Sequence, residues 1–360
     1  MADVVRKTGG ERGGLPPTPP PRGTLHARRT MPLTAQWTIT VCSGLLILLL
    51  VVSVLALSVG SVSIPLSHIL GALTGNSTIS EPERTIILSI RLPRIVLALL
   101  VGSGLSIAGV VFQALLRNPL AEPYILGISS GGTVGAIVAI GLSLGASAIT
   151  TPLASFAGSG AVMLLVYGIA HRRGQLDTHA LLLGGVMIGA FFNAAVLLII
   201  AVFNQELRNA FLWLMGNLSS ANTDAILVVA PLLLVASSLL LLQARNFNLI
   251  STGDESAMQL GVEVKKVKRL SYLLASLITG LVVSVSGVIG FVGLLIPHIC
   301  RMLFGPDHRL LLPASFLLGA SFLVVTDILS RTLLAPSEIP VGAITAAVGA
   351  PVFVWLLRKS

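Results

Sequence analysis

The sequence predicts an all-α polytopic membrane protein with about ten transmembrane helices. Only 10% of its 360 residues are charged and 54% are hydrophobic, whereas soluble domains carry about 25% charged residues. A spanning helix needs about 20 predominantly apolar residues, so the chain has room for about ten. Its 36 glycines suit helices that pack closely in lipid. The net charge of +9 is spread among the loops, which indicates membrane topology rather than nucleic-acid binding.

The chain divides into a short tail and one transmembrane domain. Residues 1–36 are rich in Pro, Gly and Arg without apolar periodicity, which predicts a disordered, basic cytoplasmic tail. A cleaved signal peptide is disfavoured, because the apolar run that follows is long enough to span. Residues 37–360 form the predicted ten-helix domain. Its spans are predicted at 38–59, 93–116, 124–142, 151–170, 179–203, 223–243, 268–286, 291–304, 310–330 and 341–357.

The basic residues test this count and give an orientation. With ten spans and the N-terminus inside, 18 of the 23 Lys and Arg residues lie on the inner side. Lys and Arg concentrate in cytoplasmic loops, so this asymmetry favours a multi-pass protein of the cell membrane with both termini in the cytoplasm. The basic residues left outside are Arg84, Arg91, Arg94, Arg208 and Arg331.

The longest polar interruption of the apolar pattern is the segment 246–269. A run of charges is usually a solvated surface. Here, however, Leu249, Ala257, Leu260 and Val262 interleave with the charges. We therefore expect a short helix-turn-helix on the inner face that presents apolar side chains to a groove on a partner.

The sequence Arg-Leu-Pro-Arg opens the second span with Arg91 and Arg94 on the outer side, and Arg331 ends the ninth span there. Two interpretations stay open from charge alone. The side chains could snorkel to the membrane interface. Alternatively, they could form a docking surface for an acidic partner, since the guanidinium group binds carboxylates in a bidentate manner.

Three glycines, Gly127, Gly131 and Gly135, recur four residues apart after a tight inner turn at 117–123. This spacing places them on one helix face, which is typical of close helix packing in membranes. Packing is favoured over direct contact with a substrate.

Other polar residues of the spans have simple structural interpretations. His298 has no His, Cys or acid at ligand spacing, so no metal site is predicted. Asp327 is an acid within a span and therefore a functional candidate, but Arg331 follows one helical turn later, so a local ion pair is the simpler account. The two cysteines imply no disulfide framework.

No P-loop pattern occurs, so the chain is not expected to hydrolyse ATP or to bind a cofactor of its own.

Several segments together resemble the transmembrane permease family of type II ABC importers for ferric siderophores, haem and cobalamin (FecCD-like). The resemblance covers nearly all of the chain after about Trp37. It rests on RLPR at 91–94, FQALLRNPLAEPYILGISSG at 112–131, NLISTGDESAMQLGV at 248–262, GVIGFVGLLIPHICRMLFGPDHRLLLPAS at 287–315 and PVGAITAAVGAPVFVWLLRK at 340–359.

The resemblance implies a non-enzymatic permease that works with several partners. These are a second permease subunit, two ABC ATPase subunits that carry ATP and Mg, and an extracytoplasmic substrate-binding protein. Arg91, Arg94 and Arg331 match family positions that pair with acids of the binding protein. The coupling segment 246–269 matches helices that sit in a groove of the ATPase. Its candidate coupling residues are Leu249, Gly253, Asp254, Glu255, Ala257, Leu260 and Gly261.

The ligand and two rival classes of function stay open at the level of sequence. Ferric siderophore is the first choice of ligand, because it dominates the family, with haem or cobalamin as alternatives. An ion-coupled secondary transporter would need an ionisable relay in the membrane, which is sparse here. An intramembrane enzyme would need a catalytic pair, and the sequence shows none.

Overall fold

We describe a computed structural model of the chain, which covers residues 34–60, 62–75, 79–142, 149–172, 175–202, 211, 213–219 and 221–358. The predicted tail, residues 1–36, lies outside this part except for its last three residues. There, Thr34 already caps helix α1, because its side chain accepts a hydrogen bond from Trp37 N at 3.2 Å.

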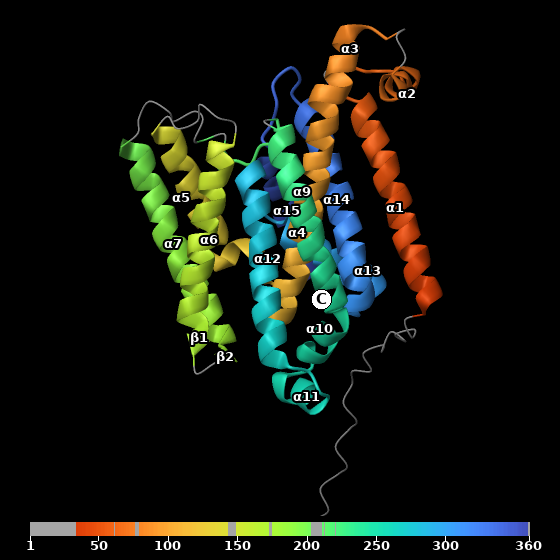
Figure 1. Ribbon diagram of the computed structural model, residues 1–360. Coiled ribbons are helices and arrows are strands. Elements are labelled where there is room, and N and C mark those ends of the chain that lie inside the picture. The colour runs from red at the N-terminus through yellow and green to blue at the C-terminus, as the bar shows by residue number, and fades with distance from the viewer. Residues whose placement is uncertain are drawn as a thin grey trace, which may run out of the picture. The chain divides into compact units, whose positions relative to one another are not determined.

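The described part of the chain contains ten apolar helices of ten residues or more, in agreement with the predicted number of spans (Figure 1). Seven are long and apolar enough to cross a membrane, and α5, α13 and α15 are shorter apolar helices. The ten are α1 (Ala35–Ser58), α4 (Leu92–Leu116), α5 (Ile128–Gly141), α6 (Thr150–Ala170), α7 (Thr178–Val202), α9 (Thr223–Leu242), α12 (Val264–Ser286), α13 (Val292–Phe304), α14 (His308–Thr332) and α15 (Val341–Leu357).

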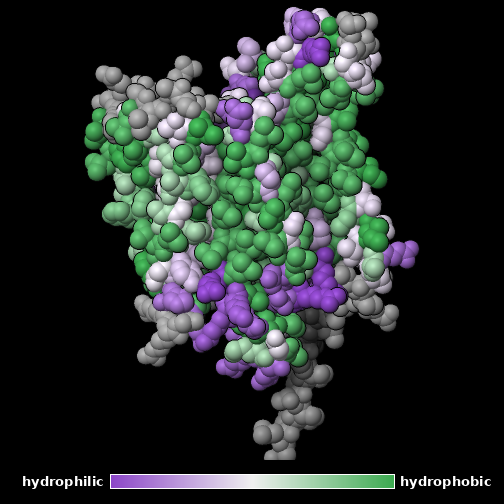
Figure 2. Space-filling view, viewed as in Figure 1, coloured by the Kyte–Doolittle hydropathy of each residue, from purple (hydrophilic) through white to green (hydrophobic). Residues whose placement is uncertain are grey.

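Short polar elements lie at the two ends of this bundle. One end, here called the α3 end, carries α2 (Leu66–Thr74), α3 (Glu81–Thr85) and η1 (Ile86–Arg91), which continues into α4. The opposite end, the α11 end, carries α10 (Ala244–Ser251), α11 (Asp254–Gln259) and the hairpin β1 (His171–Arg172) with β2 (Gln175–Leu176) (Figure 1). Hydrophilic residues gather at both ends, with a broad hydrophobic band between them (Figure 2). This distribution is that of a protein whose middle lies in lipid.

Helix α4 forms the centre of the bundle, since it packs against α9, α12, α13 and α14. Almost all of its residues from Arg94 to Leu116 are buried. Its glycines allow neighbouring backbones to approach closely. A Cβ atom on Gly102 would lie 2.2 Å from Gly319 O of α14, and one on Gly109 would lie 1.9 Å from Gly293 O of α13. Small residues at such crossings are typical of helix packing in membranes.

This crossing gives a direct stability prediction. Gly109→Ala should lower the midpoint of thermal unfolding in detergent, because the methyl group meets a backbone carbonyl that cannot move aside. Overpacking of this kind costs about 1–3 kcal/mol. The matched control is Gly160→Ala in α6, where a Cβ atom meets nothing within 4 Å. We expect the control to be neutral or slightly stabilising. Equal midpoints for the two variants would contradict the close crossing of α4 and α13.

Helices α12 and α13 are separated by a non-helical stretch, and this explains why α13 is short. Gly287 and Phe291 there have positive φ, +69° and +67°. Backbone without partners is costly in a membrane, and here side chains from the η2 region (Pro123–Leu126) supply partners. Ile289 N donates to Tyr124 Oη at 3.0 Å, and Phe291 N donates to the Glu122 carboxylate at 2.5 Å.

Candidate coupling and docking sites

The predicted coupling segment forms two short helices joined by tight corners. Helices α10 and α11 meet at Gly253, and α11 leaves through Gly261 towards α12. The φ angles of these glycines are +130° and +84°. Both lie in the region that residues with a Cβ atom rarely adopt. The two glycines therefore set the direction of α11.

The apolar residues of this segment fall into a buried group and an exposed group. Ala257 is fully buried, whereas the side chains of Met258 and Leu260 are 51% and 65% exposed. Leu249 is half-buried and Glu255 is exposed. Two large apolar side chains thus face outward at a hydrophilic end of the protein (Figure 2). Met258 was not among the residues predicted from the sequence, although its place one turn after Asp254 and Glu255 makes it part of the same helix.

Asp254 is held by two basic residues from other helices. Its carboxylate lies 2.5 Å from Lys268 Nζ of α12 and 3.3 Å from Arg117 Nη2, just after α4. The Lys268 side chain is only 6% exposed. Charge-assisted contacts of this kind are stronger than neutral hydrogen bonds. Asp254 therefore joins α11 to α4 and α12, and it is not a free acid on the surface.

Helix α10 is joined to α14 in a similar way. Asn248 Nδ2 donates to Asp307 Oδ1 at 2.8 Å, and His308 N donates to Asn248 Oδ1 at 2.8 Å. Hydrogen bonds from Arg309 and Asn248 hold the pKa of Asp307 well below its usual range. Asp307 therefore stays ionised at neutral pH. A force on α10 and α11 would reach the long helices α4, α12 and α14 through these contacts.

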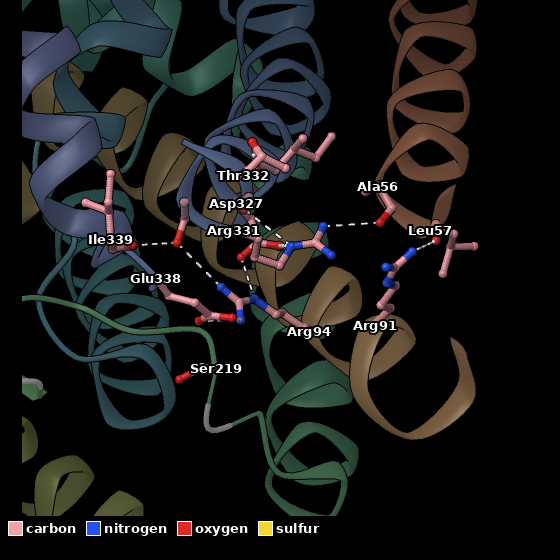
Figure 3. A network of polar contacts seen from close by, with 12 residues as sticks. Ala56, Leu57, Arg91, Arg94, Ser219, Asp327, Arg331, Thr332, Glu338 and Ile339 are labelled. Atoms are coloured by element: carbon pink, nitrogen blue, oxygen red, sulfur yellow. Dashed lines mark hydrogen bonds and ion pairs between the residues drawn. The ribbon is translucent and has the colours of Figure 1, made fainter. Parts of the chain in front are cut away.

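At the α3 end, Arg94 lies inside the protein rather than on its surface. Its side chain is 5% exposed. Arg94 Nε lies 2.6 Å from Asp327 Oδ1 of α14, and Nη1 lies 2.8 Å from Glu338 Oε2 in the loop before α15 (Figure 3). Asp327 is fully buried, whereas the Glu338 side chain is 43% exposed.

Arg91 and Arg331 extend this arrangement to the end of α1. Arg331 Nε lies 3.0 Å from Asp327 Oδ2, which is the local pair that the spacing predicts, and Nη2 donates to Ala56 O at 3.1 Å. Arg91 Nη1 donates to Leu57 O at 2.5 Å (Figure 3). We call Arg91, Arg94, Arg331, Asp327 and Glu338 the arginine network. Its most exposed charged group is the Glu338 carboxylate, so the docking role of the three arginines stays a prediction.

The three predicted packing glycines do not share one partner helix. A Cβ atom on Gly131 or Gly135 would meet α6, at 2.5 Å from Gly158 O and 2.1 Å from Ala154 O. Gly127 precedes α5 with φ +73°, and a Cβ atom there would meet Gly185 and Gly189 of α7. The four-residue spacing thus brings α5 close to α6, while Gly127 lies at the turn and faces α7.

The other predicted polar residues lie apart from each other. Within the described ranges, no group of three His, Cys, Asp or Glu side chains is placed to hold a metal ion. His298 packs edge-on against Phe353 of α15, with ring centroids 5.8 Å apart. Cys42 and Cys300 are free thiols.

These features define a multi-pass membrane protein of the permease type. The chain belongs to the FecCD transport family, whose pattern matches residues 47–359.

Relatives of known class and one solved structure agree with this assignment. The chain is 43% identical over 316 residues to the uncharacterized ABC transporter permease protein YvrB of Bacillus subtilis, covering 85% of this chain and 90% of that protein. It is 41% identical over 321 residues to the hemin transport system permease protein HmuU of Yersinia pestis, covering 88% and 95%. Its fold matches an inward-facing structure described as a metal-chelate type ABC transporter, with TM-score 0.78, 32% identity and 90% of this chain covered.

Proposed function

We propose that this permease carries an iron chelate across the cell membrane, with ferric siderophore as the first choice. The family assignment carries this proposal. Relatives 34–41% identical to the chain are named as permeases for hemin, Fe(3+)-citrate and iron(3+)-hydroxamate. Another, 43% identical, is named as a cobalamin permease. Haem and cobalamin are therefore the alternative ligands.

The α11 end faces the cytoplasm in this proposal. Exposed basic residues Lys265, Lys266 and Arg269 lie there, and Lys and Arg favour the cytoplasmic side. We infer that the N- and C-termini lie on this same side of the membrane.

Two ABC ATPase subunits would bind the α10–α11 region and supply ATP and Mg. The exposed side chains of Met258 and Leu260 are suited to a groove on such a partner. A second permease subunit completes the passage, as a homodimer or a related heterodimer, and an extracytoplasmic binding protein delivers the chelate to the α3 end. This chain supplies no chemistry.

Uptake by the reconstituted complex tests this function. We would load the binding protein with one radiolabelled ligand at a time: a ferric hydroxamate, ferric citrate, hemin or cobalamin. We expect uptake only with ATP on the α11 side and preference for an iron chelate. Uptake that follows a proton or sodium gradient without ATP would instead support the ion-coupled class.

For the binding protein to dock at the arginine network, one of its carboxylates must replace the Glu338 carboxylate beside Arg94. Glu338 covers the outer edge of Arg94 with two contacts, at 2.8 and 2.9 Å from Nη1. Glu338→Gln should therefore tighten binding of the binding protein about 3- to 10-fold, because it removes a competing carboxylate and a like charge.

The control for Glu338→Gln is Glu81→Gln, an exposed acid of α3 at the same end of the protein. It changes the net charge equally without touching Arg94. Surface plasmon resonance on the complex in nanodiscs measures both. An equal change in the two variants would show a general charge effect and would contradict the specific role of Glu338.

A further inference from the structure

Helix α2 carries an apolar stripe that the bundle does not cover. Leu66, Leu70 and Leu73 follow each other at spacings of four and three residues, so they share one face of this helix. We call them the leucine stripe, and each side chain is more than half exposed. Ile69 and Ala72 lie on the adjoining face and are buried. The apolar surface of α2 is thus wider than the part that packs against the bundle.

Polar side chains lie on the remaining face of α2. Ser67 and Thr74 are exposed there. His68 Nδ1 lies 3.2 Å from the Glu83 carboxylate, and this contact joins the polar face to α3. Helix α2 therefore has an apolar and a polar face, which suits a helix that lies flat at the boundary between acyl chains and lipid headgroups.

The leucine stripe adjoins a surface of the bundle that faces lipid. Helix α1 exposes large aliphatic side chains along its length, among them Ile47, Leu50 and Leu55, and α2 contacts α1. Figure 1 shows α2 beside the end of α1, at the edge of the bundle and across the direction of the long helices. The exposed apolar surface of α1 is thus continued at this end by the leucine stripe.

We propose that α2 lies in the outer membrane interface, where phospholipid is its partner and the leucine stripe is immersed among the acyl chains of the outer leaflet. The assignment to the outer leaflet rests on the orientation given under the proposed function. Helix α2 contains no Lys or Arg, so electrostatic attraction to anionic headgroups does not hold it there. Its attachment depends on the removal of the leucine side chains from water.

The linker between α1 and α2 connects this anchor to the arginine network. Ser58 Oγ donates to Ile64 O at 2.7 Å, and Ile64 N donates to Ser58 O at 3.0 Å, so the linker forms a closed loop. Arg91 donates to Leu57 O at the end of α1 and to Val62 O in the linker. Immersion of α2 therefore fixes the height of Arg91 relative to the membrane.

Spin labels on single cysteines test the placement of α2. The complex with Cys42→Ala and Cys300→Ala would be labelled in nanodiscs, and relaxation would be measured with oxygen, which concentrates in lipid, and with a nickel chelate, which stays in water. The oxygen-to-nickel ratio should be at least about 3-fold higher at Leu70→Cys than at Ser67→Cys, because an interfacial helix immerses only its apolar face. Ile47→Cys within α1 provides the lipid reference.

Three results would overturn the proposal. Equal ratios at Leu70→Cys and Ser67→Cys would place the leucine stripe in water. Protection of Leu70→Cys from both reagents would show that a protein, such as a second copy of the chain, covers the stripe. Exposure to nickel that ends only when loaded binding protein is added would assign the stripe to that protein.

A charge within the leucine stripe provides a second test. Leu70→Asp should release α2 from the lipid and lower the ratio at Leu66→Cys to that of Ser67→Cys, whereas the matched control Ser67→Asp should leave it unchanged. An equal ratio in both variants would contradict the anchor. These ratios depend neither on the transported ligand nor on the side of the membrane that carries α2. They therefore separate an error about α2 from an error about the proposed function.

Discussion

The double substitution Met258→Asp with Leu260→Asp is expected to separate ATP hydrolysis from transport. Both side chains are more than half exposed at the end of α11, where we propose that the ATPase binds. In an interface, the few central residues that carry most of the affinity cost about 2 kcal/mol or more when truncated, and a buried unpaired charge adds to this. We expect affinity for the ATPase subunits to fall at least about 100-fold.

Two measurements check this expectation. Co-purification of the ATPase subunits from detergent reports assembly, and ATPase activity with loaded binding protein reports coupling. Membrane insertion and thermal stability of the isolated permease should not change, because neither side chain is buried.

The control for the coupling face is Lys266→Ala. Lys266 forms an exposed pair with Glu263, with side chains 72% and 67% exposed, and such pairs contribute little. If the double variant assembled and coupled as well as this control, α11 would not be the ATPase contact.

The ten apolar helices could be predicted from sequence because lipid imposes a simple rule. Each span must be apolar over about 20 residues, and the predicted ends generally fall within a few residues of the observed ones. Helices α5 and α12 each start about four residues from their predicted positions. The predicted span of α5 begins at 124, but Gly127 has positive φ and a 3₁₀ turn precedes it, so the helix begins at Ile128. Helix α12 begins at Val264 rather than 268.

Which polar residues are buried could not be predicted, because their partners are distant in sequence. The pair of Asp327 and Arg331 was visible from its spacing of four residues. The partners of Arg94 lie 233 and 244 residues away, and only the fold brings them together. Likewise, only the fold brings Lys268 and Arg117 to Asp254.

Asp327→Ala is expected to be the most destabilising substitution in the arginine network. Its carboxylate is fully buried and lies 2.6 Å from Arg94 and 3.0 Å from Arg331. Removing one partner of a buried ion pair costs about 3–5 kcal/mol, because the remaining charge is left uncompensated. Among the described residues, Glu338 would then be the remaining carboxylate paired with the guanidinium group of Arg94. We expect a large fall in the thermal midpoint in detergent and loss of folded protein from the membrane.

A second variant distinguishes charge from packing as the cause. Asp327→Asn combined with Arg331→Met removes one charge of each sign and nearly preserves volume, so it should recover part of the stability lost in Asp327→Asn alone. Glu338→Gln, whose carboxylate is 43% exposed, should have a much smaller effect, since solvent screens it. If Asp327→Ala were as stable as Glu338→Gln, the network would not support the α3 end.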